Sequence, residues 1–307
     1  MKKSSVKYIV GGSLSAFGVL LIIIACFMGG WKTLVNFGEI TIDLDGFHYF
    51  DVKNNEYILT GENSNMEKGD IKNLDIDVDY GKLIIKTDDV DEIKIDTKNI
   101  ITNRFRWEQS GDTLKIKYGG GFSFFTWKSN SEITITFPKD MTFDKANIKN
   151  GAGETNVNNI TADDIRMKNG AGELKFKDIS AKDILYLENG AGEAKMENID
   201  CGKLDLNGGV GEITAKNAVC SQLKLENGIG AFTYEGEING NADIDNGIGE
   251  VRMTVYGVSS DYGFDVDSGI GQVRVNGNAP ISYTESKYKF KIDTGVGEVR
   301  IDFKEKN

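Results

Sequence analysis

Histidine is almost absent from this sequence, and proline and cysteine are scarce. The 307 residues include one histidine, His48, two prolines and three cysteines. A single histidine excludes sites that need two imidazoles, which covers most zinc centres and many proton relays. So few prolines exclude a proline-rich linker and a collagen.

Positive charge is also in short supply. The chain has 36 Lys and Arg against 47 Asp and Glu, a formal net charge of −11. Residues 1–32 hold four lysines and no acid, so the remainder carries 32 cations against 47 anions. A field of this sign repels phosphate backbones, and we therefore expect no nucleic-acid partner.

Charged residues are missing altogether from Tyr8 to Trp31. As a helix, these 24 apolar-rich positions would span roughly 36 Å, enough to cross a hydrocarbon core of about 30 Å. The lysines before them place the N-terminus in the cytoplasm. We expect a single-pass cell-membrane protein with a basic cytoplasmic tail at 1–7, a transmembrane helix at 8–31, a juxtamembrane segment at 32–70 and an extracytoplasmic domain at 71–307.

Two other fates of the apolar segment stay open. A cleaved signal peptide would have a shorter apolar stretch, of about 7–15 residues, that ends at an A-x-A-type site. A lipoprotein signal is suggested by Ile23-Ile24-Ala25-Cys26, which would make Cys26 the lipidated first residue, but the apolar run continues beyond it. The uncleaved anchor fits the length best, and every alternative leaves the rest of the chain facing outward at a membrane.

Glycine, by contrast, is abundant and falls largely in a repeat. A motif of the form polar–Gly–small or aliphatic–Gly occurs eight times between residues 150 and 298, at steps of 19, 20, 19, 19, 19, 22 and 26 residues. So regular a step indicates stacked units, whose sharp bends need glycine at positive φ. The expected turn glycines are Gly151, Gly153, Gly170, Gly172, Gly190, Gly192, Gly209, Gly211, Gly228, Gly230, Gly247, Gly249, Gly269, Gly271, Gly295 and Gly297.

Between these motifs apolar and polar residues alternate, which predicts strands. In one unit the inward candidates are Leu174, Phe176, Leu185 and Leu187, with Tyr186 pointing outward. One unit cannot bury its own apolar face, whereas stacked units share a core. The prediction is an all-β chain, a parallel β-helix or β-solenoid of about 19-residue coils with right-handed winding, after the transmembrane helix.

Like residues recur in columns through the repeat. Glutamates end six of the motifs, and Lys or Arg two positions later favours an ion-paired, solvated ladder over a row of bound calcium. The asparagines that open the motifs predict a hydrogen-bonded turn ladder. The residue between the two glycines of each motif should point inward at the bend: Ala152, Ala171, Ala191, Val210, Ile229, Ile248, Ile270 and Val296.

Chemistry-bearing motifs are not found. Cys201 and Cys220 are 19 residues apart, so both should point inward on adjacent coils, where two buried thiols are favoured over a disulfide. No third glycine and helix follow Gly-x-Gly as a dinucleotide loop would require. We expect no catalytic, metal or cofactor site, and no enzyme.

Residues 97–147 depart from the repeat and are rich in aromatic residues. As a packed hairpin insertion they would cap the solenoid, which is the favoured interpretation. As an exposed patch they would bind a glycan, a protein partner or a bilayer. The candidate partner-binding residues are Trp107, Phe122, Phe124, Phe125 and Trp127.

Together these features resemble a known family. The residues concerned are the basic-flanked apolar segment, Ile76–Gly81, Gly111–Ile116, Phe124–Trp127, Ile133–Pro138 and the NGAGE coils. The chain resembles the bacterial β-strand-repeat, adhesin-like proteins of unknown function (LiaG-like, membrane-anchored, common in Gram-positive bacteria). The resemblance implies an extracytoplasmic β-solenoid, sometimes linked to cell-envelope stress systems, and supplies no catalytic residues.

We therefore expect a non-enzymatic surface protein whose partner is an envelope glycan or a membrane protein. A regulatory or accessory component of an envelope-stress membrane complex is the alternative. A polysaccharide-cleaving β-helix enzyme is less favoured, because it rests on fold analogy alone.

Overall fold

The computed structural model describes residues 41–43, 46–48, 52–59, 71–119, 131–281 and 286–305. The expected transmembrane helix at 8–31, the lipidation candidate Cys26 and the aromatic run at 122–127 lie outside the described residues. Within the described ranges no helix is both long and apolar enough to cross a bilayer.

The chain divides into two units, and most of the described residues belong to the second. In the first unit the described residues form an antiparallel hairpin of β1 (Thr41–Asp43) and β2 (Gly46–His48). The second unit comprises Asp51–Phe122 and Asn130–Asn307, and it holds all the features discussed below.

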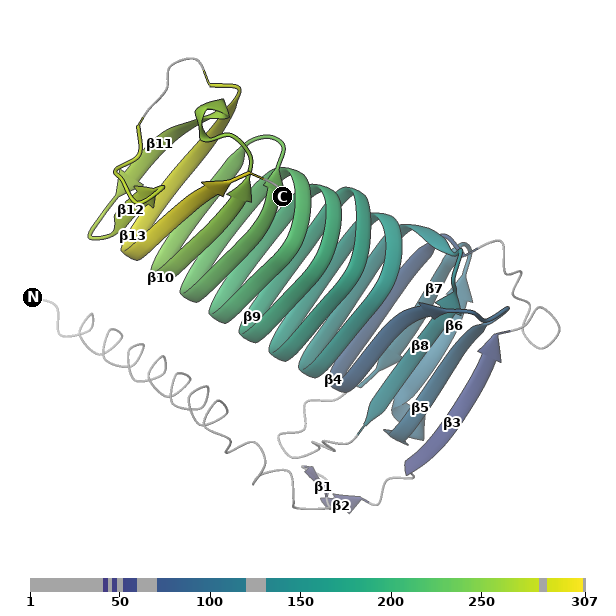
Figure 1. Ribbon diagram of the computed structural model, residues 1–307. Coiled ribbons are helices and arrows are strands. Elements are labelled where there is room, and N and C mark those ends of the chain that lie inside the picture. Colours follow the sequence, from purple (N-terminus) through teal and green to yellow (C-terminus); the bar gives the residue numbers. More distant parts are fainter. Residues whose placement is uncertain are drawn as a thin grey trace, which may run out of the picture. The chain divides into compact units, whose positions relative to one another are not determined.

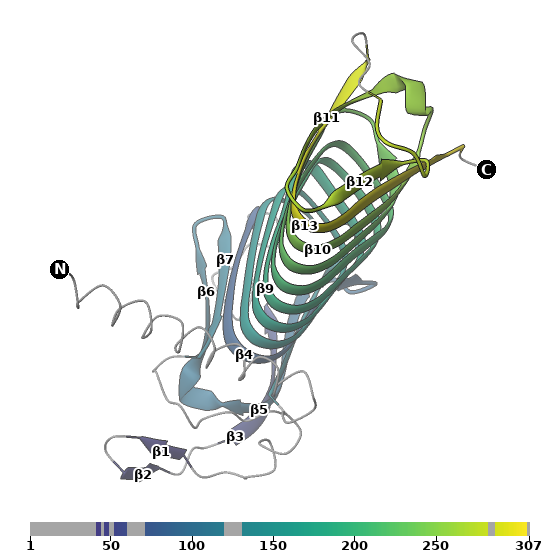
Figure 2. The same ribbon diagram turned by 90° about the vertical axis from the view of Figure 1, so that its left-hand side faces the viewer.

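The body of the second unit is a stack of flattened coils (Figures 1 and 2). The chain winds through β4 (Asn73–Asp88), then the 97-residue β9 (Thr142–Ile238) and β10 (Ala242–Tyr256). Neighbouring coils pair in parallel: Gly249 of β10 lies beside Gly230 of β9, a shift of one 19-residue repeat, and Gly153 lies beside Gly81 of β4. The predicted all-β, stacked-coil architecture is present in this part of the chain.

Alternating side chains build one continuous core along the stack. Leu174, Phe176, Leu185 and Leu187 are at most 1% exposed, as the alternation predicts, whereas Tyr186 is not buried. Each coil places its apolar residues directly over those of the next coil, because a shift of one repeat preserves the side-chain period of two. Stacking therefore hides apolar surface that one coil would expose.

The first bend of each coil is the Gly-x-Gly motif, and its two glycines are needed for different reasons. Gly192 has φ +127°, in the left-handed region that favours glycine. Gly190 does not have a positive φ, but a Cβ on it would lie 2.5 Å from the carbonyl oxygen of Gly170 on the preceding coil. The second glycine thus makes the turn in seven of the eight motifs, and the first permits the close stacking of the coils. The predicted positive φ is wrong for the first glycines and for Gly271.

The second bend of the coils uses asparagine and aspartate instead of glycine. Asp178 and Asn198 both have φ +56°, which these two residue types tolerate best after glycine. Their side chains pair across coils: Asn198 Nδ2 donates to Asp178 Oδ1 at 2.6 Å, and Asn217 Nδ2 donates to Asn198 Oδ1 at 2.8 Å. This bend was not predicted from the sequence.

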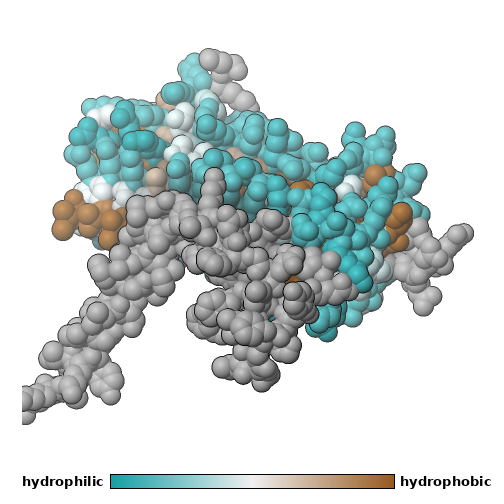
Figure 3. All heavy atoms as spheres, turned by 90° about the horizontal axis from the view of Figure 1, so that it is seen from below, coloured by the Kyte–Doolittle hydropathy of each residue, from teal (hydrophilic) through white to brown (hydrophobic). Residues whose placement is uncertain are grey.

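The expected inward orientation of the residue between the two glycines is wrong. Ile229 and Ile248 are 50% and 51% exposed, and Val296 and Ile270 are 45% and 88% exposed. The side chain at this position therefore lies on the outer side of the bend and not in the core. These four residues line up on adjacent coils, and we call them the aliphatic ridge. Figure 3 shows apolar surface at the C-terminal end of the stack, on a face that is otherwise mainly hydrophilic.

At the N-terminal end of the stack, the two arms of β4 continue into separate sheets. One arm pairs in parallel with β7 (Thr113–Tyr118), which forms a hairpin with β6 (Phe105–Ser110). The other arm pairs with β8 (Glu132–Pro138), followed by β5 (Ile93–Ile101) and β3 (Val52–Leu59). Among the described strands, β6 and β3 therefore form the two outer edges of this end.

At the C-terminal end, stacking order differs from sequence order. The last strand, β13 (Tyr288–Lys304), lies between β10 and the pair β11 (Tyr262–Ser268) and β12 (Gln272–Val275). Thr294 consequently lies beside Asn246, two motifs earlier in the sequence. The irregular final steps of 22 and 26 residues reflect this insertion. The 3₁₀ turn Ser259–Asp261 leads into β11, and Thr102–Arg104 leads into β6.

Candidate functional site

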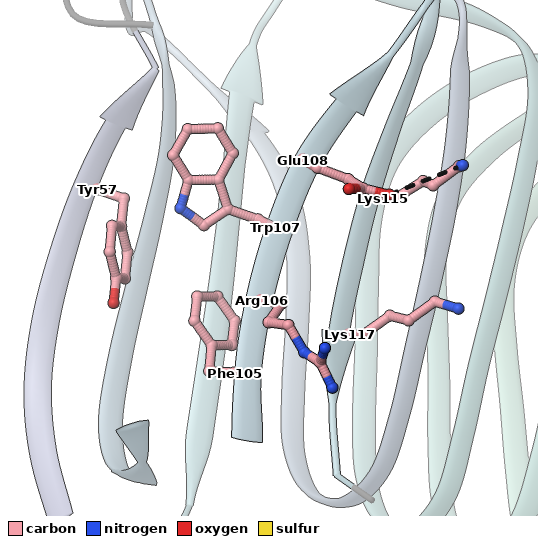
Figure 4. A pocket seen from close by; sticks show the side chains of 7 residues that line it. All are labelled: Tyr57, Phe105, Arg106, Trp107, Glu108, Lys115 and Lys117. Carbon is pink, nitrogen blue, oxygen red and sulfur yellow. Dashed lines mark ion pairs between the residues drawn. The ribbon is translucent and has the colours of Figure 1, made fainter. Parts of the chain in front are cut away.

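A cavity of about 600 Å³ lies at the N-terminal end of the stack, around the edge strand β6 (Figure 4). Three aromatic side chains and four charged ones line it: Tyr57, Phe105, Arg106, Trp107, Glu108, Lys115 and Lys117. Strands β3, β6 and β7 supply them, and these strands continue the two arms of the first coil.

The aromatic part of the site bridges the two sheets. The ring centroid of Tyr57 on β3 lies 5.5 Å from that of Phe105 and 6.3 Å from that of Trp107, both on β6. Phe105 is buried, while Tyr57 and Trp107 are only partly buried and pack against the core. The trio therefore covers the end of the core and leaves aromatic surface exposed, which suits stacking or apolar contact with a partner.

The cationic part lies on the other face of β6. Arg106 is directly opposite Lys117 in the antiparallel β6–β7 register. Like charges in this position destabilise a sheet, and no carboxylate of the described residues is within ion-pair distance of either cation. Lys115 is 3.8 Å from Glu108. The two facing cations are flanked by the carboxylates of Asp77, the neighbour of Lys117 on β4, and Glu108, two residues along β6 from Arg106.

Aromatic and cationic groups are thus separated by one strand. Successive residues of β6 point to opposite faces, so Phe105 and Trp107 face inward and Arg106 faces outward. Figure 4 shows the rings and the cations on the two sides of the β6 ribbon. Between them, the outer edge of β6 has no strand neighbour among the described residues. An extended ligand lying along this edge can contact both faces and the unpaired backbone groups.

One residue of this site was predicted from the sequence. Trp107 lines it, whereas the candidates Phe122, Phe124, Phe125 and Trp127 lie outside the described residues. The sequence analysis did not predict Tyr57, Arg106 or Lys117 as site residues. Tyr57 was missed because it lies in a segment assigned to the juxtamembrane region. Aromatic and charged residues alternate in Phe105–Glu108, and this alternation could have predicted a strand with aromatic residues on one face and Arg106 on the other.

The repeated glutamates belong to an ion-paired ladder, as predicted. Lys175 Nζ lies 2.9 Å from Glu173 and 3.8 Å from Glu154, on neighbouring coils. Lys195 Nζ likewise lies 2.7 Å from Glu193. Within the described ranges no group of three or more His, Cys, Asp or Glu side chains is arranged to hold a metal ion. Lys175 and Lys195 each lie within 4.0 Å of carboxylates on two coils, which reduces the repulsion within the glutamate column.

The asparagine column is a buried hydrogen-bonded ladder at the bend, also as predicted. Asn227 Nδ2 donates to Asn246 Oδ1 at 2.8 Å, and Asn246 Nδ2 donates to Thr294 Oγ1 at 3.3 Å. Asn169 Nδ2 donates to Asn189 Oδ1 at 2.8 Å. At Gly208, which interrupts the column, a Cβ would lie 3.0 Å from Ile213 Cδ1. An apolar side chain thus occupies the missing place in the ladder.

Cys201 and Cys220 are buried and free, without a disulfide between them. The Cys220 sulfur lies 3.7 Å from the hydroxyl of Tyr234, which donates to the carbonyl of Ala218 at 3.0 Å. Burial raises the pKa of Cys220 to about 11 and raises the pKa of Cys201 further, with the nearby Cys220 adding to the effect. Both thiols are therefore protonated at neutral pH and serve as core residues.

Several solved structures are similar to this chain at low sequence identity. A "putative adhesin" from Bacteroides fragilis matches 82% of this chain and 97% of its own, with 14% identity and a TM-score of 0.42. Another from Parabacteroides distasonis matches 83% of this chain and 98% of its own, with 14% identity and a TM-score of 0.42. No curated protein matches the sequence.

The family comparison covers the whole stack. Residues 71–307 match the Toastrack DUF4097 family, in agreement with the resemblance seen in the sequence. This segment begins just before β4 and includes every glycine-marked bend. The chain therefore belongs to the Toastrack DUF4097 family.

Proposed function

We propose that the protein is a non-enzymatic, adhesin-like interaction module of the bacterial cell envelope. It is anchored by residues 8–31, with the stack outside the membrane and the basic tail inside. The stack acts as a rigid carrier, since each coil is hydrogen-bonded to its neighbours along both arms. The end formed by β3, β6 and β7 is the partner-binding surface.

The observation that carries this proposal is that β6 presents partly exposed aromatic rings on one face and a pair of facing cations on the other. Arg106 and Lys117 face each other on β6 and β7, with no ion pair to either cation in the described part of the chain, and Trp107 lies on the same strand as Arg106. Tryptophan and arginine are the residues most often dominant in protein interfaces. The repeated carboxylates of the coils are instead engaged in ion pairs, which favours a structural role for them and a non-enzymatic protein.

Binding to isolated cell-wall sacculi tests the proposal. The full chain is reconstituted in lipid nanodiscs and mixed with sacculi, and the bound fraction is measured by sedimentation. The variant Arg106→Glu with Trp107→Ala should bind at least about 30-fold more weakly, since truncation of a dominant interface residue costs about 2 kcal/mol. Lys177→Glu with Lys216→Glu, two exposed cations on the coils, is the matched control and should bind normally.

Equal binding by the two variants would remove β6 from the binding surface. The topology has its own test: protease added to intact protoplasts should degrade the stack and spare the residues on the cytoplasmic side. A stack that is protected until the protoplasts are lysed contradicts the proposed orientation.

A further inference from the structure

The aliphatic ridge is not explained by the folding of the stack. Its members Ile229, Ile248, Val296 and Ile270 project from the first bends of adjacent coils and are between 45% and 88% exposed. The glycines beside them are explained by the turn and by the close approach of the coils. Neither requirement applies to the residue between the glycines. A row of exposed aliphatic side chains, unlike a single one, indicates a contact outside the stack.

The ridge is the end of a longer uncharged edge. All eight motifs place glycine, an apolar residue and glycine at the first bend, so three consecutive positions of each of these coils carry no charged or hydrogen-bonding side chain. The central residue is alanine in the first three motifs, Val210 in the fourth and one of the ridge residues in the rest. Although 27% of the chain is charged, this edge can enter an apolar medium without burying a charge.

The shape and size of the ridge favour a bilayer over a folded protein as its occupant. The ridge lies on the outer side of the bends and is one side chain wide, with neighbouring side chains about 5 Å apart along the stack. A stable protein interface buries about 800 Å² of each partner and involves about 20–30 residues, whereas the ridge offers four. Acyl chains deform around a narrow ridge and need no complementary groove.

The charges that follow the ridge in the sequence fit a shallow insertion. Two of the four ridge motifs end in a neutral residue in place of glutamate. In the other two, Glu250 is paired with Arg252, and Glu298 Oε1 lies 3.7 Å from Arg274 Nε. A paired carboxylate costs less to bring to the headgroups than a free one, and the long arginine side chains can reach lipid phosphates.

Exposed aspartates before the ridge limit how deep it can go. Asp245 and Asp267 lie three residues before Ile248 and Ile270, which is about 10 Å along a strand. Because these carboxylates must stay in water, the ridge reaches only the boundary between headgroups and acyl chains, about 5–10 Å deep. Anionic lipids would repel the same carboxylates. The surface that fits is therefore a zwitterionic bilayer.

We propose that the aliphatic ridge inserts into the surface of a zwitterionic phospholipid bilayer and holds the stack along the membrane. The inference rests on the membrane anchor of the proposed function and deepens it, because it gives the stack an orientation. The ridge residues follow one another along the stack, so their insertion sets the stack axis parallel to the bilayer. The ridge contains no residue of the β6 surface, and both can therefore act in one molecule.

Lipid contact at single positions tests the proposal. The full chain with Cys26→Ser is reconstituted in phosphatidylcholine nanodiscs, and a fluorescent probe is attached to one introduced cysteine, Ile248→Cys or Lys216→Cys. Cys201 and Cys220 are buried and do not compete for the probe. Spin-labelled lipids quench only fluorophores that they contact. They should quench the probe at Ile248→Cys but not the probe at Lys216→Cys, which is exposed beside the second bend.

Breaking the ridge separates a specific contact from mere nearness to the membrane. In the Ile248→Cys chain, Ile229→Asp with Ile270→Asp should lower the quenched fraction at least about tenfold, because two carboxylates would have to leave water. The matched control Lys177→Asp with Lys216→Asp, beside the second bends, should be quenched like its parent. High salt should not release the contact, since salt screens charges and not apolar contacts.

The opposite results overturn the proposal. Equal quenching at Ile248→Cys and Lys216→Cys, no quenching at either, or unchanged quenching after the ridge is broken would each show that the ridge does not contact lipid specifically. A probe at Ile248→Cys that is shielded from water but not quenched would mean that residues 8–31 or a second copy cover the ridge. All of these results leave the proposed anchor intact. A chain that does not stay with the nanodisc contradicts the anchor, and the inference with it.

Discussion

Replacing Gly192 by valine probes the bend geometry on which the whole stack depends. Gly192 has φ +127°, a conformation that costs a residue with a side chain about 1–3 kcal/mol. A Cβ at this position would also overlap the carbonyl oxygen of Gly172 on the preceding coil, and relieving such overpacking costs about 1–3 kcal/mol more. We expect the free energy of unfolding to fall by about 2–6 kcal/mol.

Two further substitutions separate these contributions. Gly111, in the β6–β7 turn, has φ +63°, and a Cβ on it would have no heavy atom within 4 Å, so Gly111→Val reports the conformational cost alone. Gly190→Ala reports the packing cost alone, because its φ is not positive and its Cβ would lie 2.5 Å from the oxygen of Gly170. Ala191→Val has neither problem, since the equivalent Ile229 is exposed.

Urea unfolding of the full chain, followed by far-ultraviolet circular dichroism, measures all four variants. Gly192→Val should be the least stable and Ala191→Val should be close to the wild type. If Gly192→Val loses no more stability than Gly111→Val, neighbouring coils do not approach closely at the bend. Wild-type stability in Gly192→Val would falsify the assignment of the turn itself.

Three other substitutions or conditions have defined outcomes. Arg106→Glu converts the like-charged pair with Lys117 into an oppositely charged pair. The free energy of unfolding, measured by thermal denaturation, should therefore rise by about 0.2–1 kcal/mol, and a loss of stability contradicts the pairing of these two residues. Asn227→Ala leaves Asn246 Oδ1 without its 2.8 Å donor and should cost about 1–3 kcal/mol in urea unfolding; an unchanged midpoint argues against the ladder. Burial raises the Cys220 pKa from 9.0 to about 11, so its contribution to stability is complete below pH 9 and is lost as the pH rises through 11; in a Cys26→Ser chain at pH 8 a thiol reagent should react with Cys201 and Cys220 only after unfolding, and rapid labelling of that native chain refutes this.

The strands, the inward columns and the glycine step were predictable because they depend on local rules. Alternation with a period of two selects the buried residues, as at Leu174 and Phe176. The constant step then fixes which residues share a column, so the glutamate and asparagine ladders follow from the sequence. One residue type at a fixed interval is enough to predict each ladder.

The orientation of the residue between the glycines was mispredicted because hydrophobicity was taken to mean burial. Ile248 is 51% exposed and Ile270 is 88% exposed, so an apolar residue at this position of the motif does not mark the core. The second bend was missed because glycine was taken as the only turn signal. Asparagine or aspartate recurs at residues 159, 178, 198 and 217, all with positive φ, and this column could have been identified.

The candidate site depends on long-range pairing that no local pattern contains. Tyr57 reaches Phe105 because β3 pairs with β5 and joins the stack from outside the repeat. The facing cations Arg106 and Lys117 depend on the hairpin register, which the turn at Gly111 predicts only once both strands are recognised. Local patterns therefore predicted Trp107 and not its neighbours.

The position of β13 has a consequence for how the molecule is completed during synthesis. Its residues are made after those of β11 and β12, yet they lie between β10 and the pair β11–β12. Residues 262–275 must therefore wait, without a strand to pair with, until Tyr288–Lys304 have been translated and delivered. Coils up to β10 can pair with the preceding coil as they are translated, but β11 and β12 can pair only after β13 has been made, so a chain that ends before residue 288 keeps the repeat and leaves β11 and β12 unpaired.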